Sequence, residues 1–268
     1  MTSPVTVSCG WATHTGHRRT LNEDSLLVQA PLFLVADGMG GHQAGEEASA
    51  GAIGEFAGLV GRPTVSLDEI RLAIARARAR VDALPANGTG RAGTTLSGVA
   101  LTSVDGVGYW LALNIGDSRT YRLADGEFEQ ITVDHSVVQE LIDAGQLLAV
   151  DARGDRRRNI ITRALGAGSV GEADYWMIPA ETGDRILVCS DGLSSEVSDE
   201  VIAQILAENG DPQEAADHLI AAALEQGGRD NITAVVVDAV HVRMSPSGGE
   251  DDIDVDTLPR AEAAGGVQ

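Results

Sequence analysis

Short apolar runs rich in β-branched residues alternate with glycine and acidic residues along most of this chain. The segments 5–15, 25–30 and 32–36 are predicted to be strands, because such runs flanked by Gly or Asp are typical of buried strands. An alanine-rich stretch predicts a helix over 44–59. A capping box at 66–69 opens a second helix that carries one apolar face. Two long helices therefore precede the middle strands.

The rest of the chain continues with short elements. The runs 93–101, 107–115 and 119–123, followed by a turn at Asp125-Gly126, predict an antiparallel meander. Residues 152–158 hold four arginines without periodicity and are expected to form a mobile insert. The later elements are predicted as helices at 135–144, 198–208 and 212–226 and a closing strand at 232–242.

The length and composition favour one domain over residues 1–243. Residues 244–268 have too little apolar surface to offset the entropy of ordering, so a disordered acidic tail is expected there. The start of the chain lacks the basic and long apolar segments of a signal peptide, and no uninterrupted apolar run is long enough to span a bilayer. A soluble, cytoplasmic protein is therefore expected.

The formal charge of the chain is −21, and the acidity belongs to the whole domain rather than to the tail alone. A field of this sign repels polyanions, which argues against nucleic acid and anionic membranes as partners and favours metal ions or basic peptides. All 19 basic residues are arginine, so any phosphate would be held by guanidinium groups. Cys9 and Cys189 are too few and too far apart for a disulfide framework or a zinc site, and both are expected to be small buried hydrophobes.

Three aspartates stand beside predicted strands. Asp37, Asp191 and Asp230 each adjoin a short apolar run, and the glycine-rich segment 38–41 follows the first of them. Rigid strands would deliver these carboxylates to the rim of a core. Clustered carboxylates repel one another unless they are protonated or share a cation, and oxygen ligands favour Mg²⁺ or Mn²⁺. The pattern favours a divalent metal site, although each aspartate taken singly fits a turn as well.

Seven short motifs occur together in a defined order. They occupy residues 19–24, 35–42, 93–95, 114–119, 132–135, 189–192 and 229–231. Over about residues 5–242 the chain thereby resembles the bacterial branch of the PPM metal-dependent serine/threonine phosphatases, also called type 2C. The resemblance implies an α+β fold, a four-layer α-β-β-α sandwich of two antiparallel sheets flanked by helix pairs. It also implies a binuclear Mn²⁺ or Mg²⁺ site at one end of the sandwich.

The resemblance assigns a role to each matching residue. Asp37 would bridge both ions, and the carbonyl of Gly38 would bind the second of them. Asp191 and Asp230 would bind the first ion. The other implied roles are water orientation by Glu23 and Asp24, a third and weaker metal site at Asp134, and phosphate binding by Arg19.

The chain departs from the family at one position that matters for proton transfer. Animal and plant members often have a histidine, credited as the general acid, where this chain has Met39. A serine or threonine alkoxide is a poor leaving group, so an acid is expected, either a metal-bound water or His42. The segment from Asp117 to Arg119 fits a salt-bridged turn as well as a catalytic role. The remaining histidines singled out here, His14, His17, His135 and His218, are expected to be ordinary surface or loop residues.

The arginine-rich insert falls where this family carries its flap, at about residues 135–171. Its four arginines would bring positive charge to an acidic cleft and attract phosphorylated loops or acidic docking sequences, or else they belong to a solvated loop. These arginines are Arg153, Arg156, Arg157 and Arg158.

The leading hypothesis is a cytoplasmic phosphatase that removes phosphate from serine and threonine in proteins and opposes protein kinases. Two alternatives stay open. One is a phosphatase-like regulatory module that binds phosphoproteins without turnover, and the other is an enzyme for small phosphate esters.

Overall fold

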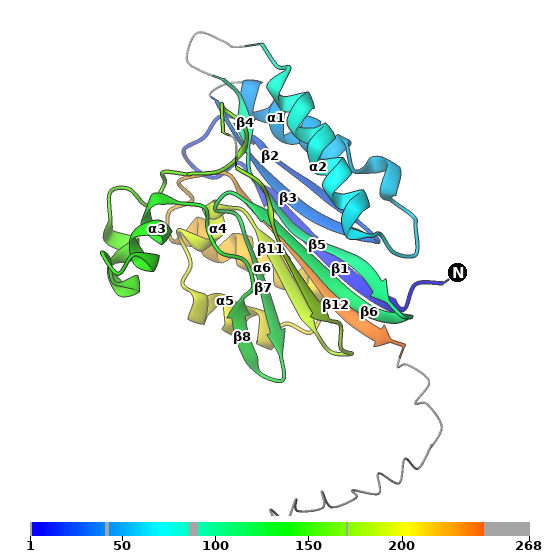
Figure 1. Ribbon diagram of the computed structural model, residues 1–268. Helices are drawn as coiled ribbons and strands as arrows, with labels where there is room; N and C mark the ends of the chain where they lie inside the picture. Colours follow the sequence, from blue (N-terminus) through cyan, green and yellow to red (C-terminus); the bar gives the residue numbers. More distant parts are fainter. Residues whose placement is uncertain (1, 41–42, 86–90, 170, 244–268) are drawn as a thin grey trace, which may run out of the picture.

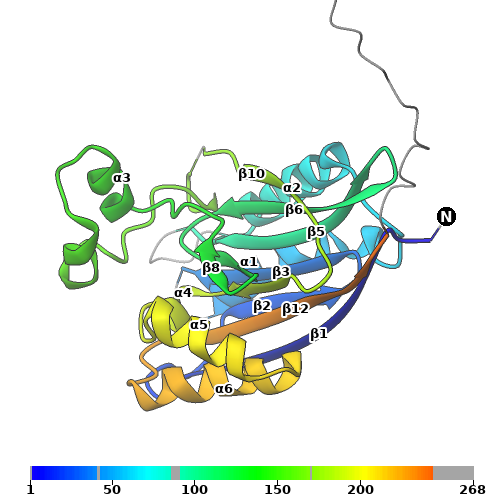
Figure 2. The same ribbon diagram turned by 90° about the horizontal axis from the view of Figure 1, so that it is seen from below.

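The computed structural model describes residues 2–40, 43–85, 91–169 and 171–243. His42 and the tail predicted at 244–268 therefore lie outside the described residues. Two antiparallel sheets stack face to face, with one helix pair on each outer side (Figures 1 and 2). This arrangement confirms the predicted four-layer sandwich.

The larger sheet has seven strands in the described residues. Its order is β10-β6-β5-β3-β4-β9, with β2 paired to β3. The bounds are β2 (Asp24–Gln29), β3 (Leu32–Met39), β4 (Gly93–Thr94), β5 (Leu96–Val104), β6 (Val107–Ile115), β9 (Leu165–Gly166) and β10 (Asp174–Pro179). Helices α1 (Gln43–Gly54) and α2 (Leu67–Asp82), joined through the 3₁₀ turn η1 (Ala57–Leu59), cover its outer face.

The second sheet has the order β1-β12-β11-β7-β8. Its strands are β1 (Val5–His14), β7 (Arg119–Ala124), β8 (Glu127–Gln130), β11 (Arg185–Cys189) and β12 (Ile232–Val242). Helices α5 (Asp199–Glu208) and α6 (Pro212–Glu225) cover it, and the short α4 (Asp191–Ser194) follows β11 directly. Among the described helices none is both long and apolar enough to cross a membrane.

Side-chain caps fix where the helices begin. The predicted capping box is present at α2, where the Ser66 hydroxyl accepts from Glu69 N–H and the Glu69 carboxylate accepts from Ser66 N–H. At α6, Asp211 accepts from two backbone N–H groups, and Pro212 follows at the first helical position, where no N–H is needed.

Three apolar layers hold the sandwich together. One lies between α1, α2 and the larger sheet, and another lies between the smaller sheet and α4 to α6. The third lies between the two sheets and includes Phe33, Val35, Val188 and Val235, all fully buried. Side chains of β3 therefore alternate between two cores, because successive residues of a strand point to opposite faces.

The predicted antiparallel meander is wrong. Strands β5 and β6 form a hairpin in the larger sheet, whereas β7 and β8 pair in the other. The chain crosses between the sheets at Gly116, which has φ of +115°; a Cβ there would lie 2.5 Å from Cγ2 of Thr95. Only glycine fits this turn without strain.

Other boundaries also differ from the sequence predictions. The alanine-rich helix ends at Gly54, five residues early, and the strand predicted at 93–101 is interrupted at Thr95. Strand β10 was not predicted. Cys9 is exposed rather than buried, and it lies on β1, an edge strand of the second sheet.

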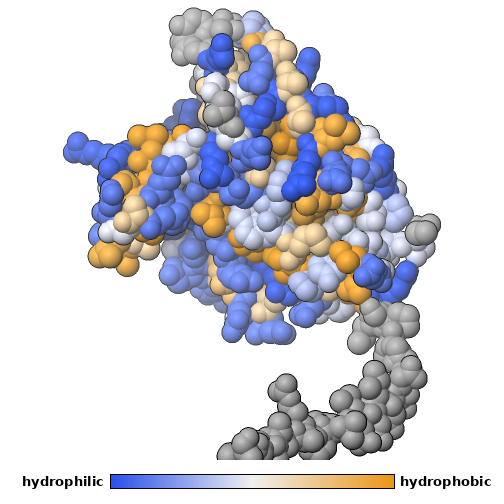
Figure 3. Space-filling model, viewed as in Figure 1, coloured by the Kyte–Doolittle hydropathy of each residue, from blue (hydrophilic) through white to orange (hydrophobic). Residues whose placement is uncertain are grey.

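The flap projects from the sandwich beside α3 (Val137–Asp143), at the left of Figure 1. The 3₁₀ segment η2 (Ala149–Gly154) overlaps the start of the insert predicted at 152–158. Polar and apolar side chains mix on its surface (Figure 3), and the exposed apolar residues of the flap are Leu148, Val150 and Ile160.

Replacing Phe33 by alanine should lower the free energy of unfolding by about 3–5 kcal/mol, because it opens a cavity between the two sheets. Val104→Ala is the control; this side chain is 44% exposed at the end of β5, and the change should cost less than about 0.5 kcal/mol. Urea unfolding measures both, and equal losses would contradict the assignment of Phe33 to this core.

Candidate active site

Strand register brings the predicted acids to one end of the sandwich. Asp24 and Asp37 lie opposite each other on β2 and β3. Asp191 begins α4 immediately after β11, and Asp230 precedes β12, which pairs with β11. The charge of Asp191 acts on the pKa of Asp37, so side chains 154 positions apart in sequence come close here.

The acids raise one another's pKa. Burial, and then the charges of Asp24 and Asp191, hold the pKa of Asp37 well above its usual range. Burial raises the pKa of Asp24 to about 7, against the effect of two hydroxyl donors. Burial and repulsion by Asp230 raise the pKa of Asp191 to about 6. The cluster therefore favours either protons or a cation.

Divalent cations fit this cluster on the chemistry of its donors. Oδ1 of Asp24 and Oδ1 of Asp117 are buried and have no hydrogen-bond partner among the described residues. No three acids, histidines or cysteines in the described ranges form a ready-made cage. Mg²⁺ does not require one, because it is commonly held by one or two carboxylates with water completing its shell. The roles of Asp37, Asp191 and Asp230 as ligands stay predictions.

An asparagine holds the loop that leads to Glu23 and Asp24, the acids predicted to orient water. Nδ2 of Asn231 donates to the carbonyls of Thr15 and Leu21 at 2.9 and 2.8 Å, and its Oδ1 accepts from Glu23 N–H at 2.8 Å. The sequence analysis included Asn231 in a motif but gave it no role. Its burial beside Asp230 shows that it positions the loop.

Close contacts also hold Asp24 and Gly38 in place. Asp24 Oδ2 accepts from the hydroxyls of Ser190 and Thr233 at 2.8 and 2.7 Å. Gly38 donates its N–H to the carbonyl of Glu23, and a Cβ on Gly38 would lie 2.1 Å from the carbonyl oxygen of Gly45. Glycine at position 38 therefore lets α1 approach the strand that carries Asp37.

Arg19 stands at the rim of the acids. Its guanidinium donates to Asp230 at 2.6 Å, and its side chain is half exposed. The hydrogen bond to Asp230 raises the pKa of Arg19. The structure thus places this arginine beside a predicted ligand, while its phosphate-binding role stays a prediction.

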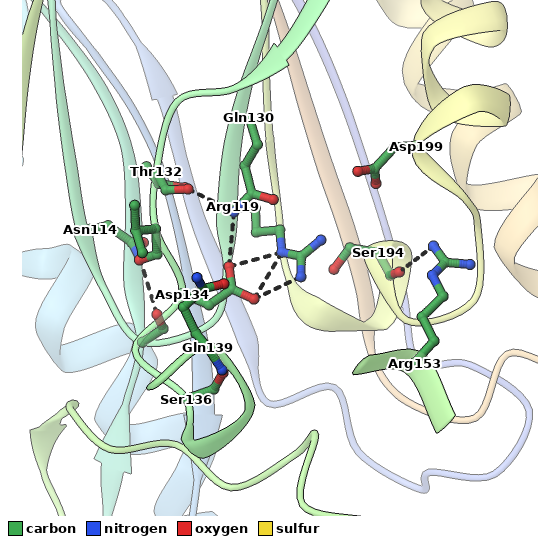
Figure 4. Close-up of polar contacts among 12 residues, drawn as sticks. Asn114, Arg119, Gln130, Thr132, Asp134, Ser136, Gln139, Arg153, Ser194 and Asp199 are labelled. Atoms are coloured by element: carbon green, nitrogen blue, oxygen red, sulfur yellow. Dashed lines mark hydrogen bonds and ion pairs between the residues drawn. The ribbon is translucent and has the colours of Figure 1, made fainter. Parts of the chain in front are cut away.

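At the turn between the sheets, the ion pair differs from the one that the sequence suggested. Arg119 forms a two-pronged ion pair with Asp134, at 2.7 to 3.1 Å, and not with Asp117 (Figure 4). Gln130 also donates to Asp134 at 3.0 Å. Asp117 is buried, and its pKa is held well above the usual range by burial and then by Asp191. The sequence analysis left Asp117 out of the site. The structure brings it in, because its Oδ1 is buried without a hydrogen-bond partner among the described residues.

A cleft of about 250 Å³ runs from these acids to the flap. Asp117, Asp134 and Asp191 lie on its inner wall, and Arg153, Arg158 and Arg229 contribute to its lining. Arg153 is anchored, because its Nη2 donates to the carbonyls of Ser194 and Val197 at 3.2 and 2.7 Å. Arg156 and Arg157 do not line the cleft.

Known proteins identify the family. The family model described as protein phosphatase 2C matches residues 13–226. The chain belongs to the protein phosphatase 2C family. The serine/threonine phosphatase stp of Listeria monocytogenes serovar 1/2a is 35% identical over 242 residues, which cover 84% of this chain and 93% of that protein.

Mycobacterium tuberculosis supplies the second comparison. Its serine/threonine protein phosphatase PstP (strain H37Rv) is 42% identical over 228 residues, 83% of this chain but only 43% of PstP. This chain thus spans less than half the length of that relative. A crystal structure of PstP superposes with a TM-score of 0.80 at 38% identity, covering 88% of this chain and 99% of the other. A PstP catalytic-domain structure in complex with two manganese ions gives 0.78 at the same identity and coverage.

In this phosphatase-family domain both ends of the flap meet at Asp174 on β10. His135 Nε2 lies 3.0 Å from Asp174 Oδ2, and Arg163 donates to both oxygens of the same carboxylate. The ring of His135 also accepts from Gly116 N–H, and burial lowers its pKa. Of the two expectations for His135, a surface or a loop residue, the loop is confirmed and the surface position is wrong, because tertiary contacts bury the ring.

A second anchor comes from the outer helix pair. Arg78 on α2 donates to the carbonyls of Ala164, Ser169 and Gly171. The segment that returns from the flap is thus tied to the helix layer as well as to β10.

Stability without divalent ions should fall as pH rises from the ordinary aspartate value of 3.8 toward about 7. In this range the folded state keeps the proton on Asp24 that the unfolded state releases. The unfolding midpoint should drop by about 2–4 °C for each kcal/mol lost. Asp24→Asn, which cannot ionise, is the control in thermal unfolding with chelator. A stability difference between the two proteins that does not change with pH would refute this assignment.

Asp174→Ala should expose the flap to trypsin, which cleaves after arginine. Loss of the contacts to His135 and Arg163 should speed cleavage within 153–158 by about tenfold or more. Glu172→Ala removes an exposed acid two residues away and should leave the rate unchanged. Mass spectrometry of the fragments over time measures both cleavage rates. Equal rates for the two variants would show that Asp174 does not hold the flap.

Proposed function

We propose that this domain hydrolyses phosphoserine and phosphothreonine in proteins. It would use two Mn²⁺ or Mg²⁺ ions held by Asp37, the carbonyl of Gly38, Asp191 and Asp230. The observation that carries the proposal is the buried cluster of mutually repelling carboxylates at the end of the sandwich. The two manganese ions in the PstP catalytic domain, 38% identical to this chain, support it.

When bound, the ions acidify water and neutralise charge on the transferring phosphate. The side chains supply positioning. Glu23 and Asp24 accept hydrogen bonds from water, and Ser190 and Thr233 hold the Asp24 carboxylate in place. Arg19, at the rim, offers two parallel donors to phosphate oxygens. Asp117 or Asp134 would bind a third, weaker ion. Asp117 is favoured, because its Oδ1 has no hydrogen-bond partner among the described residues, whereas Asp134 is paired with Arg119.

The leaving alkoxide needs a proton. Met39 cannot provide it, so water ordered by Glu23 and Asp24 is the source that fits the described residues. The substrates would be phosphorylated proteins, and the enzyme would oppose protein kinases. The cytoplasmic location expected from the sequence belongs to this proposal. A regulatory module without turnover is less well supported, because all of the predicted carboxylate ligands are present.

Hydrolysis of a phosphothreonine peptide should require Mn²⁺ or Mg²⁺ and stop with chelator. Asp37→Asn and Asp191→Asn should each lower kcat by at least about a hundredfold, since even the outer-shell partners of a metal contribute 10–100-fold. Asp68→Asn, on the exposed start of α2, is the matched control and should retain full activity.

Metal-dependent turnover that is lost in the two site variants but not in Asp68→Asn would support the phosphatase. Tight binding of the peptide without metal-dependent turnover would favour the regulatory module instead. Faster hydrolysis of a small phosphate ester than of the peptide would favour the other alternative, an enzyme for small phosphate esters.

A further inference from the structure

The two sides of the cleft differ in the charges that are not neutralised by an ion pair within the protein. On the inner wall Arg119 is neutralised by Asp134, and Asp117 and Asp191 stay as unpaired acids for the metal site. On the flap side, Arg158 lines the cleft, and no hydrogen bond or ion pair of its guanidinium is formed within the described residues. A cation thus faces the cleft opposite the acids.

The neighbours of Arg158 leave its charge free. Asp155, the nearest acid in sequence, is engaged by Arg157 through hydrogen bonds of 2.9 and 2.7 Å. Arg229, on the same cleft, is paired with the buried Glu196 at 2.8 Å. Arg153 donates from Nη2 to the carbonyl of Ser194 (Figure 4) and to that of Val197. Among these arginines, Arg158 is the one whose whole guanidinium has no hydrogen bond or ion pair within the described residues.

The anchoring of the flap fixes the backbone from which that guanidinium extends. Arg153 ties the flap to the end of α4, the helix that begins with Asp191. Five residues later, Arg158 N–H bonds to the Asp155 carbonyl and closes a turn. The backbone at Arg158 is therefore held beside the acids, and its exposed side chain can reach an anionic group of a substrate segment bound in the cleft.

We infer that Arg158 selects phosphoprotein substrates that carry a second anionic group, a carboxylate or another phosphate, within a few residues of the phosphoresidue. This inference rests on the proposed function of the same site. The chain as a whole, with a formal charge of −21, repels acidic sequences. An acidic substrate therefore gains specificity only where a local cation compensates, and Arg158 provides it at the cleft.

The test is a set of peptides with one phosphothreonine among alanines. One glutamate is moved through positions −4 to +4, and a further peptide carries phosphotyrosine at the best position, with products separated by mass. In the wild type, kcat/KM for the best glutamate peptide should exceed that of the all-alanine peptide by about two- to fivefold, the range of an exposed ion pair. The phosphotyrosine arm shows whether phosphate serves better than carboxylate.

Arg158→Ala should reduce this ratio to about one, and Arg158→Glu should reverse it in favour of a lysine peptide. Arg156→Ala is the matched control: the same charge is removed two residues away, from an exposed arginine outside the cleft lining. That variant should keep the ratio. Thermal midpoints equal to the wild type confirm that each variant is folded.

A wild type without preference at any position would overturn the inference, as would equal loss of the ratio in Arg158→Ala and Arg156→Ala, which indicates a diffuse field. Failure of the proposed function gives a different result: no peptide is hydrolysed with Mn²⁺. In that case the same peptides are compared by fluorescence anisotropy. An affinity ratio that does not depend on Arg158 then rejects the inference separately.

Discussion

Repulsion among buried carboxylates at one end of the β-sandwich is the constraint on which the rest of the site depends. Burial and the neighbouring charges hold the pKa of Asp37 and of Asp117 well above the usual range, and raise those of Asp24 and Asp191 to about 7 and 6. Such a cluster opposes folding in its ionised form. A fold that keeps it therefore needs counter-charge, and shared divalent ions supply this where the donors are oxygen atoms.

The sandwich supplies the rigidity that this constraint requires. Apolar layers on both faces of β3 fix the strand that carries Asp37, and Asn231 ties the loop before β2 to the start of β12. Arginines compensate the outer acids: Arg19 pairs with Asp230, and Arg119 pairs with Asp134. Of the three predicted ligands, Asp230 has an arginine partner, whereas Asp37 and Asp191 have no ion pair among the described residues and are left to whatever cation binds.

Much of this could be predicted from local sequence. The strand runs, the capping box at Ser66 and the three strand-end aspartates depend on period, propensity and neighbours in the chain, and the resemblance to type 2C phosphatases gave the layers. Contacts between distant segments could not be predicted. The pairing of Arg119 with Asp134, the burial of His135 under Asp174 and the crossing at Gly116 each depend on which sheets meet. Short elements such as β10 lack a pattern long enough to recognise.

The most direct measurement of the central claim is the anomalous scattering of manganese in crystals of this domain. The account predicts two anomalous peaks, one for each manganese ion, within binding distance of the carboxylates of Asp37, Asp191 and Asp230. It also predicts that the ion pair between Arg19 and Asp230 lengthens or breaks. Manganese found only at exposed carboxylates, with the buried cluster unchanged from the contacts described above, would contradict the claim that these acids are held together to bind divalent ions.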